Sequence, residues 1–322
     1  MTGAKRDRVL MILSFLAIHI VWGSTYLAVR YTVETIPPLL AAGIRHLCGG
    51  GVLFLWCWWR GLRPTREEWR ASLVLSVMFF LIGHGTLFWA EMYVPSGIAA
   101  LLISAEPLWV AGLATLAGHR SRPSAAAIAG LIIGIAAVAL LVGRPTTLGT
   151  KEFLGSIALV LSGFSWSVGI IYSKNARLHP NPMMSSAMTL LSGGTLLALT
   201  SVLTGSATNL DVTAISARSV ISLAYLIVFG AATFAGYTWL LTRVSPVLVA
   251  THAYTNPLIA VILGGALAGE AITPRVAVSA IAIVLSILLV KSDRPTEPVA
   301  LQRPLASEET PRQSVRVRGS RQ

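Results

Sequence analysis

Charged side chains are scarce in this sequence. They make up 12% of the 322 residues, against roughly a quarter in ordinary soluble domains, and only 13 of them are acidic. Apolar residues make up 54%, and the mean hydropathy is +0.72. Because so few polar side chains cannot cover a globule of this size, most of the surface has to face hydrocarbon. The composition therefore excludes an ordinary soluble fold and predicts a protein that crosses the membrane several times.

Signatures of several enzyme classes are also missing. The sequence has no G-x-x-x-x-G-K-[ST], H-E-x-x-H or G-x-S-x-G, and so lacks the marks of an ATP-driven pump, a zinc protease and a serine hydrolase. Its two cysteines, Cys48 and Cys57, lie nine residues apart, on opposite faces of a helix. The histidines His19, His84 and His252 lie in different apolar runs without metal-ligand spacing. We expect neither an enzyme nor a cofactor or metal site.

The apolar residues gather in ten runs of about twenty residues, each long enough to cross about 30 Å of hydrocarbon as a helix. The period-two alternation of barrel strands is absent, and a helix satisfies its own backbone hydrogen bonds in lipid. We predict an all-α integral membrane protein with ten transmembrane helices. The predicted spans are Val9–Val29, Pro38–Trp59, Trp69–Ala90, Pro95–Leu116, Ala125–Val142, Phe153–Tyr172, Pro182–Leu203, Ser216–Leu241, Pro246–Ala268 and Arg275–Val290.

The net charge of +12 is explained better by membrane topology than by nucleic-acid binding. The Lys and Arg residues sit in short clusters between apolar runs, without interleaved aromatics. The larger clusters alternate with connections that carry few cations, so the positive-inside rule places both termini in the cytoplasm. The tail, residues 292–322, is rich in Pro, Arg, Ser and Glu, and we expect it to be disordered and solvated. Contact of its arginines with anionic lipid is the alternative.

The second half of the chain repeats features of the first half. The segment Val94–Leu108 aligns with Val244–Leu258 at a spacing of about 150 residues. The two halves, residues 9–143 and 151–291, each hold five predicted helices, and because five is an odd number the repeats have inverted topology. Two inverted halves can adopt two arrangements of similar energy, one open to each side of the membrane. The repeat therefore predicts a carrier that works by alternating access.

Short strings of the sequence also match the motifs of a known family. They are Ile20–Tyr26, Pro37-Pro38 with Arg45, Val94–Gly97, Tyr254–Pro257 and Gly269-Glu270. Together they resemble EamA-type transporters of the drug/metabolite transporter superfamily, over Val9 to Val290. The resemblance implies a ten-helix carrier of the bacterial inner membrane, usually an exporter of amino acids, other metabolites or drugs, coupled to an ion gradient. One departure is Gly118-His119-Arg120, where the first half lacks the acid found at Glu270.

Ionisable residues inside a span are functional candidates, because they are costly in hydrocarbon unless paired or hydrated. In the first half we expect Arg45, His84 and Glu106 to form one polar layer, in which Arg45 attracts a carboxylate and Glu106 or His84 takes a proton during transport. The alternative is a static Arg45–Glu106 pair that holds two helices together. Glu91 is predicted nearer the outer rim, exposed or paired at a gate.

In the second half the corresponding depth holds His252, Tyr254 and Asn256. Four residues separate His252 from Asn256, so both lie on one helix face and can reach the same substrate site. Ordinary hydrogen bonding between helices is the alternative role for these residues. On the first and sixth helices, Trp22, Tyr26 and Trp166 are candidates for an aromatic wall of the substrate site, with packing as the alternative.

Two prolines and two glycine pairs fall inside the predicted spans. Pro107 and Pro257 occupy equivalent positions in the two halves, where a proline kinks a helix and frees carbonyl groups, and we predict that they are hinges. The pairs Gly130-x-x-x-Gly134 and Gly265-x-x-x-Gly269 predict close packing of helices.

The sequence as a whole favours a secondary active transporter, exporting amino acids or related small metabolites by alternating access with proton coupling. A multidrug exporter of cationic compounds is the alternative, and a passive channel is a further one. The expected partners are a small-molecule substrate and the lipid bilayer, with no nucleic acid, and the expected oligomeric state is monomer or homodimer.

Overall fold

The protein is described here by a computed structural model that places residues 3–116, 124–143, 149–241, 243–244, 249 and 252–292. Within these ranges all regular structure is helical. The predicted tail lies outside the described residues, apart from Ser292. The all-α prediction is confirmed for the described part of the chain.

In the first half the chain runs through five rods, two of them with an irregular middle and one broken. The first rod is α1 (Gly3–Leu16), the π-helix η1 (Ala17–Val21) and α2 (Trp22–Thr32), and the second is α3 (Pro38–Trp59). The third combines α4 (Arg66–Ser76), the π-helix η2 (Val77–His84) and α5 (Gly85–Ala90). The fourth is split into α6 (Ser96–Ile103) and α7 (Glu106–Leu116), and the fifth is α8 (Ala125–Val142).

The second half contains longer uninterrupted helices. They are α9 (Thr150–Ser173), α10 (Pro182–Leu203), α11 (Ala217–Leu241), α13 (His252–Ala268) and α14 (Pro274–Ser292), with the short 3-10 turns η3 (Ala207–Asn209) and η4 (Val212–Ala214) before α11. Eight helices of the described chain are long and apolar enough to cross a membrane, and two shorter apolar helices, Thr255–Ala268 and Pro274–Val290, follow them.

Helix ends agree with local sequence signals. The spans of α3, α8 and α10 begin and end at the predicted residues. Proline at the first position of α3 and α10 fixes a helical φ where no backbone donor is needed. At α4 the Thr65 hydroxyl and the Glu68 carboxylate form a reciprocal capping box.

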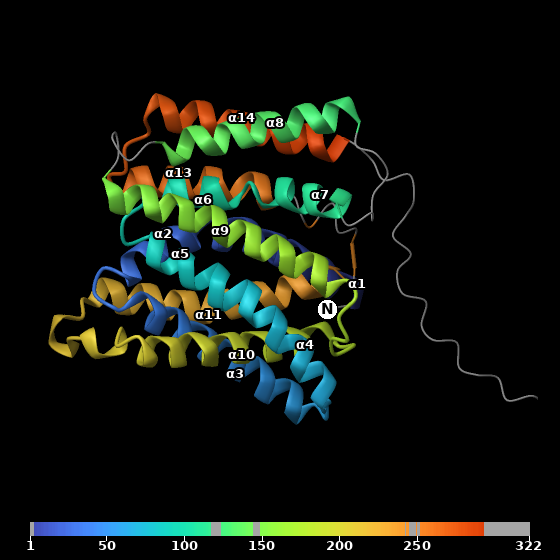
Figure 1. The fold of residues 1–322 in the computed structure, drawn as a ribbon. Helices are drawn as coiled ribbons and strands as arrows, with labels where there is room; N and C mark the ends of the chain where they lie inside the picture. Colours follow the sequence, from blue (N-terminus) through green and yellow to red (C-terminus); the bar gives the residue numbers. More distant parts are fainter. Residues whose placement is uncertain are drawn as a thin grey trace, which may run out of the picture.

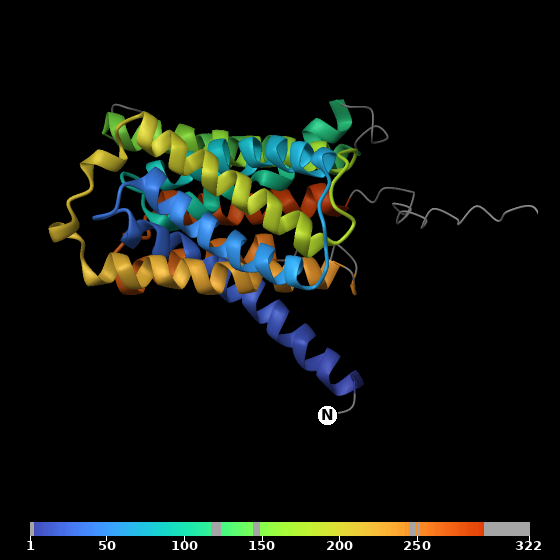
Figure 2. The same ribbon diagram turned by 90° about the horizontal axis from the view of Figure 1, so that it is seen from below.

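The helices pack as pairs from opposite halves of the sequence. α3 lies beside α10, and α8 lies beside α14, with α6, α7, α9 and α13 between these pairs (Figure 1). The beginning of α1 projects from the bundle (Figure 2). Outward-facing apolar side chains such as Ile132 and Ile281 are 63% and 70% exposed, as expected for surfaces that contact lipid.

One of the two predicted glycine pairs packs as expected. A Cβ on Gly130 would lie 2.8 Å from the Ser286 carbonyl oxygen, so only glycine lets α8 approach α14 this closely. The second pair is corrected by the structure, since Gly269 has left α13 and adopts a φ of 65°. Gly269 therefore ends the helix, in a conformation that glycine adopts without strain.

The connections gather at two ends of the bundle, which we name by position. The terminal end carries the N-terminus and residues 60–65 and 174–181, and the distal end carries residues 33–37, 91–95 and 269–273 (Figure 1). If the positive-inside prediction holds, the terminal end faces the cytoplasm and the distal end faces the outside.

Candidate functional site

Three rods lose regular α-helical geometry part-way along their length. The first contains η1 with His19, the third contains η2 with His84, and the fourth is interrupted at Ser104–Ala105. π-Bulges are frequent at functional sites, and irregular backbone inside a membrane protein is tolerated where it is buried in protein or lines a polar space. These three irregular segments therefore mark the candidate functional region of the protein.

The broken rod places Glu106 at the start of a half-helix. Around the break, Ala105 N donates to the Leu102 carbonyl (3.4 Å) and Leu108 N to the Ala105 carbonyl (2.9 Å), so short turn bonds replace the α-helical ones. Pro107 then falls in the first turn of α7, where its missing N–H costs nothing. The irregularity expected at this proline is present as an interruption of the helix at Ser104–Ala105, just before Pro107, and the hinge role of Pro107 stays a prediction. Pro257 does lie inside a helix, α13.

The Glu106 carboxyl faces tyrosines rather than a cation. Tyr26 of α2 and Tyr237 of α11 both lie close enough to interact with it electrostatically. Within the described part of the chain it forms no ion pair, so the static Arg45–Glu106 pair is not present. A carboxyl at a helix N-terminus is favoured by the helix dipole.

Arg45 lies on α3 in contact with α5 and α11. Its guanidinium carbon sits 5.9 Å from the centre of the Phe88 ring, and a Cβ added to Gly230 would lie 3.4 Å from one of its terminal nitrogens. Glu91, Tyr26 and Tyr225 lie within electrostatic range, and Tyr225 shares a 2.6 Å hydrogen bond with Ser24. No carboxylate among the described residues pairs with Arg45. The cation is therefore held in the interior by an aromatic face and polar hydroxyls.

His84 is paired with a histidine that the sequence analysis did not select. Nδ1 of His84 lies 2.7 Å from Nε2 of His46, which is 3% exposed. The His84 ring also stacks on Trp166 with 5.3 Å between ring centres, and Phe80 lies edge-on to it at 5.2 Å. Arg45 acts electrostatically on both histidines. Of the predicted layer, Arg45 and His84 are therefore neighbours, and their shared neighbour is His46.

A second cluster joins the first rod to α11 and α13. The Trp22 ring lies 4.9 Å from that of His252 and 5.0 Å from that of Tyr237. Asn256 is 8% exposed, and its amide group can accept from His252 Nδ1 (3.2 Å) while donating to the His19 carbonyl (2.9 Å). This arrangement fits the alternative of interhelical hydrogen bonding for Asn256. The side chain of Tyr254 lies outside the described part of the structure.

The three residues predicted to form an aromatic wall do not lie together. Trp166 packs against Phe79 and His84, with ring centres 4.4 Å and 5.3 Å away, whereas Trp22 packs against Tyr237 and His252. Tyr26 packs against the apolar core around Leu101 and Leu102. Trp22, Tyr26 and Trp166 therefore pack against different parts of the interior.

Serines of α9 hold the irregular segments in place. Ser162 Oγ donates to the Gly83 carbonyl (2.8 Å) and Ser165 Oγ to the Met78 carbonyl (2.8 Å), so both satisfy carbonyls of η2. Ser167 Oγ lies 3.2 Å from the Glu106 carbonyl but 2.8 Å from the Gly163 carbonyl of its own helix, which is the shorter contact. A π-turn leaves carbonyls without an intrahelical donor, and side chains of a neighbouring helix can supply one. The sequence signal is the pair of serines at 162 and 165.

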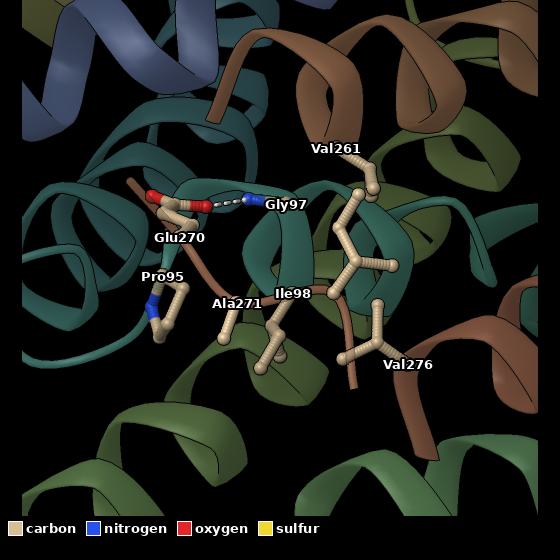
Figure 3. A pocket seen from close by; sticks show the side chains of 8 residues that line it. Pro95, Gly97, Ile98, Val261, Glu270, Ala271 and Val276 are labelled. Atoms are coloured by element: carbon tan, nitrogen blue, oxygen red, sulfur yellow. Dashed lines mark hydrogen bonds between the residues drawn. The ribbon is translucent and has the colours of Figure 1, made fainter. Parts of the chain in front are cut away.

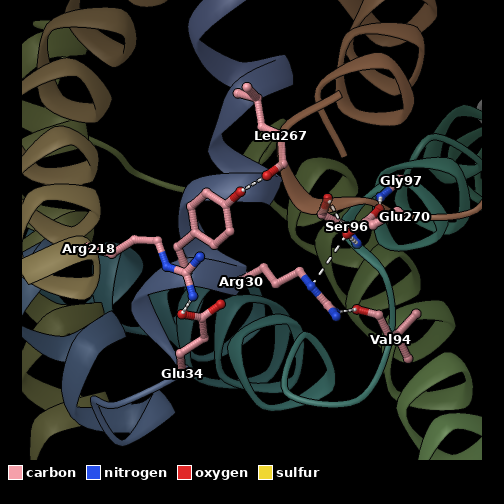
Figure 4. Close-up of polar contacts among 9 residues, drawn as sticks. Arg30, Glu34, Val94, Ser96, Gly97, Arg218, Leu267 and Glu270 are labelled. Carbon is pink, nitrogen blue, oxygen red and sulfur yellow. Dashed lines mark hydrogen bonds and ion pairs between the residues drawn. The ribbon is translucent and has the colours of Figure 1, made fainter. Parts of the chain in front are cut away.

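At the distal end a carboxylate caps the start of α6. Glu270 Oε1 accepts from Ser96 N (2.7 Å) and Ser96 Oγ (2.9 Å), and Oε2 accepts from Gly97 N (3.0 Å) (Figure 4). Figure 3 shows the contact with Gly97 from another side. Arg30 lies 3.4 Å from the same carboxylate and donates to the Val94 carbonyl (3.0 Å). We call Arg30, Val94, Ser96, Gly97 and Glu270 the distal latch, because these contacts join α2, α6 and the turn after α13.

Further polar contacts tie α11 and α13 to α2 at the same end. Arg218 of α11 pairs with Glu34 (2.5 Å) and lies over the Tyr31 ring, and the Tyr31 hydroxyl donates to the Leu267 carbonyl (2.8 Å) (Figure 4). Together with the distal latch, these contacts hold four helices together at this end.

Glu91 is placed differently from the prediction. It is 1% exposed instead of lying at an open rim, and neither carboxyl oxygen has a hydrogen-bond partner. The prediction was wrong because it used only the position of Glu91 along its helix, whereas Arg30 of α2 and Glu270 after α13, both members of the distal latch, lie close to it in the folded chain.

Comparison with known proteins identifies the family. The model of the EamA-like transporter family matches residues 9–143 and again residues 153–292. The chain belongs to this family. The resemblance found in the sequence motifs is therefore confirmed, and the protein is a membrane transporter.

Relatives with similar names cover most of the chain. The uncharacterized inner membrane transporter YedA of Escherichia coli K12 is 33% identical over 291 residues, covering 88% of this chain and 92% of its own length. The uncharacterized transporter YvbV of Bacillus subtilis is 26% identical over 297 residues, covering 91% and 94%. A solved structure superimposes with a TM-score of 0.61 at 20% identity, covering 88% of this chain and 98% of its own, and so shares the fold.

Proposed function

We propose that this EamA-family transporter is a secondary carrier that exports amino acids or related small metabolites by alternating access. The observation that carries the proposal is Arg45, a cation in the interior with which no carboxylate among the described residues forms an ion pair. An unpaired charge inside a membrane protein is costly, and such residues commonly meet a ligand or a counter-ion. A substrate carboxylate supplies the missing partner.

α7 supplies the negative charge that pairs with the ammonium group of the substrate. Glu106 begins this half-helix and lies near Tyr26, which also lies near Arg45. A zwitterion can place its carboxylate at Arg45 and its ammonium group at Glu106, with the Tyr26 hydroxyl between them. Discontinuous helices form the substrate sites of many carriers, which supports this assignment.

The architecture supports alternating access. The family model matches the chain twice, over two stretches of similar length, in agreement with the inverted repeats inferred from the sequence. We infer that the distal latch belongs to a state closed at the distal end, and that the latch separates when the carrier opens there. With the terminal end toward the cytoplasm, the closed distal end faces outside, and the carrier can load substrate from within.

Proton coupling is the remaining part of the proposal. Glu106 and the His46–His84 pair are titratable groups beside the substrate groups Tyr26 and Arg45. A carboxyl or imidazole that is exposed to water in one state of the transport cycle and desolvated in the other has a different pKa in the two states, so it binds a proton in one and releases it in the other.

One observation favours a second candidate, export of cationic drugs. Glu106 has no cationic partner among the described residues, and the Trp22 and Tyr237 rings lie 5.0 Å apart nearby in α2 and α11. A carboxyl beside aromatic faces is the chemistry that binds an organic cation. On this reading Arg45 has a structural role.

Thermal unfolding of the purified protein tests both candidates. A ligand that binds the folded state raises the unfolding temperature by mass action, so amino acids, nucleosides, sugars and cationic drugs are screened side by side. We expect stabilisation by amino acids, and its loss in Arg45→Gln but not in Arg177→Gln, which alters an exposed arginine at the terminal end. Stabilisation by cationic drugs alone, retained in Arg45→Gln, overturns the amino-acid proposal in favour of the second candidate.

A further inference from the structure

Glu91 is a buried carboxyl that nothing in the proposed substrate site uses. It follows the last residue of α5 at the distal end and is 1% exposed. Both of its oxygens are shielded from solvent and lack a hydrogen-bond partner. The backbone of Arg30 lies nearby, but no hydrogen bond of acceptable geometry reaches either oxygen.

The charged and titratable groups around Glu91 come from three parts of the structure. Arg30 and Tyr26 face it from α2, Arg45 from α3, and Glu270 from the turn after α13. α9 also packs against α5, but its Lys151 lies over the Tyr93 ring, 5.4 Å from the ring centre. Neither arginine comes within ion-pair distance of Glu91.

This setting disfavours the charged form of Glu91. A buried carboxylate that has neither a hydrogen bond nor an ion pair loses its hydration without full compensation, so the group takes up a proton instead. Burial raises the pKa of the Glu91 carboxyl well above its ordinary value, and the negative charge of Glu270 raises it further, whereas Arg30 and Arg45 act in the opposite direction.

An ionised Glu91 would also weaken the distal latch. Its charge would repel the Glu270 carboxylate and would compete with Glu270 for Arg30, the cation of the latch. Separation of the latch, in turn, would admit water to Glu91 and favour its ionised form. The protonation of Glu91 and the closure of the distal end therefore depend on each other.

We propose that Glu91 is a proton-binding site and that a proton bound there is required for the distal end to close. The proposal rests on the proposed alternating-access function. A proton from water on the distal side adds to one carboxylate oxygen, giving the neutral acid, which is then enclosed when Arg30 and Glu270 come together. The closed carrier thus holds a proton that came from the distal side, as a proton-coupled exporter needs.

The test measures opening of the distal end directly. The Val94 carbonyl belongs to the latch, and the Val94 side chain is 0% exposed and packs beside Gly155 of α9. A cysteine at this position therefore reacts with a water-soluble maleimide only when the distal end opens around it. Val94→Cys is placed in a background with Cys48→Ser and Cys57→Ser, and the labelling rate of purified protein is followed from pH 5 to pH 9. No substrate or gradient is present, so the result stands even if amino acids are not the cargo.

We expect the labelling rate to rise with pH. Between the pKa values of the closed and open states, one proton released on opening changes the equilibrium about tenfold per pH unit. Glu91→Gln should label slowly at every pH, because the amide imitates the protonated acid. The matched control is Glu34→Gln, which removes an exposed carboxylate from the ion pair with Arg218 at the same end. It should raise the labelling rate but keep the pH dependence.

Two results would overturn the proposal. One is a Glu91→Gln protein that labels with the same pH dependence as the parent protein, and the other is faster labelling of Glu91→Gln at all pH values. Gel filtration and the unfolding temperature of each variant separate these results from misfolding. Failure of the amino-acid screen alongside a normal Glu91 result would overturn the cargo and leave the proton site standing.

Discussion

Nε2 of His46 lies 2.7 Å from Nδ1 of His84, which joins α3 to the π-helix η2 across 38 positions of the sequence. One ring has to donate and the other has to accept, so the pair fixes a complementary choice of tautomers. The pair also lies beside Arg45, which connects it to the proposed substrate site.

The His46–His84 pair should contribute measurably to stability. His46→Ala and His84→Ala each leave one buried ring nitrogen without a partner, which costs about 1–3 kcal/mol. We expect each variant to unfold at lower temperature or denaturant concentration in detergent. The double variant should lose less than the sum of the two, because the shared hydrogen bond is removed only once. Strictly additive losses would show that the rings act independently.

An alanine at Gly264 should open the distal latch, whereas an alanine at the neighbouring Gly265 should not. A Cβ on Gly264 would lie 2.4 Å from Glu270 Oε2, whereas the nearest atom to a Cβ on Gly265 lies 3.5 Å away, on Ile272. We expect Gly264→Ala and Glu270→Gln to speed maleimide labelling of the Val94→Cys reporter, and Gly265→Ala to leave it unchanged. Equal labelling of the two alanine variants would contradict the closed geometry of the latch.

Substrate affinity should depend on the space beside Arg45. A Cβ on Gly230 would meet the guanidinium at 3.4 Å, so the two further methyl groups of valine would displace it. We expect Gly230→Val to weaken amino-acid stabilisation nearly as much as Arg45→Gln. Gly112→Val is the control, because nothing lies within 4 Å of a Cβ there. A Gly230→Val protein that is stabilised like the parent would place the substrate away from this face of α11.

Glu106 separates coupling from translocation. In reconstituted vesicles Glu106→Gln should still exchange substrate at equilibrium, with a raised KM because the amide no longer pairs with the substrate ammonium group. It should lose uphill transport driven by a pH gradient, since the amide does not titrate. The comparison is Glu67→Gln, an exposed residue of the terminal end. Unchanged uphill transport in Glu106→Gln would leave Glu91 or the histidine pair as the coupling group.

The helices were predictable because their signals are local. The ends of α3 at Pro38 and Trp59 follow from a proline start and an interfacial aromatic group, and the span length follows from hydropathy. The break before Glu106 was not predictable to the residue. Pro107 indicated an irregularity, but whether a helix kinks or restarts there depends on its packing against neighbouring helices, which the local sequence does not show.

The site was predictable in its residue types and not in its pairings. Arg45, His84 and Glu106 could be selected because ionisable side chains are rare in apolar runs. His46 was missed although it follows Arg45 directly, because a single histidine in an apolar run carries no partner in its local sequence. The burial of Glu91 depends on Arg30 and Glu270, which lie far from it in sequence and meet only in the folded chain.

The serines of α9 have a consequence for how the molecule moves. Ser162 and Ser165 donate to carbonyls of η2, so a slide of α9 by one residue would remove two donors from buried backbone at once. α9 and η2 are thus expected to travel as one rigid block. The sliding surface of the carrier then has to pass elsewhere, along the boundary where Arg30 and Glu270 meet, whose contacts water can replace.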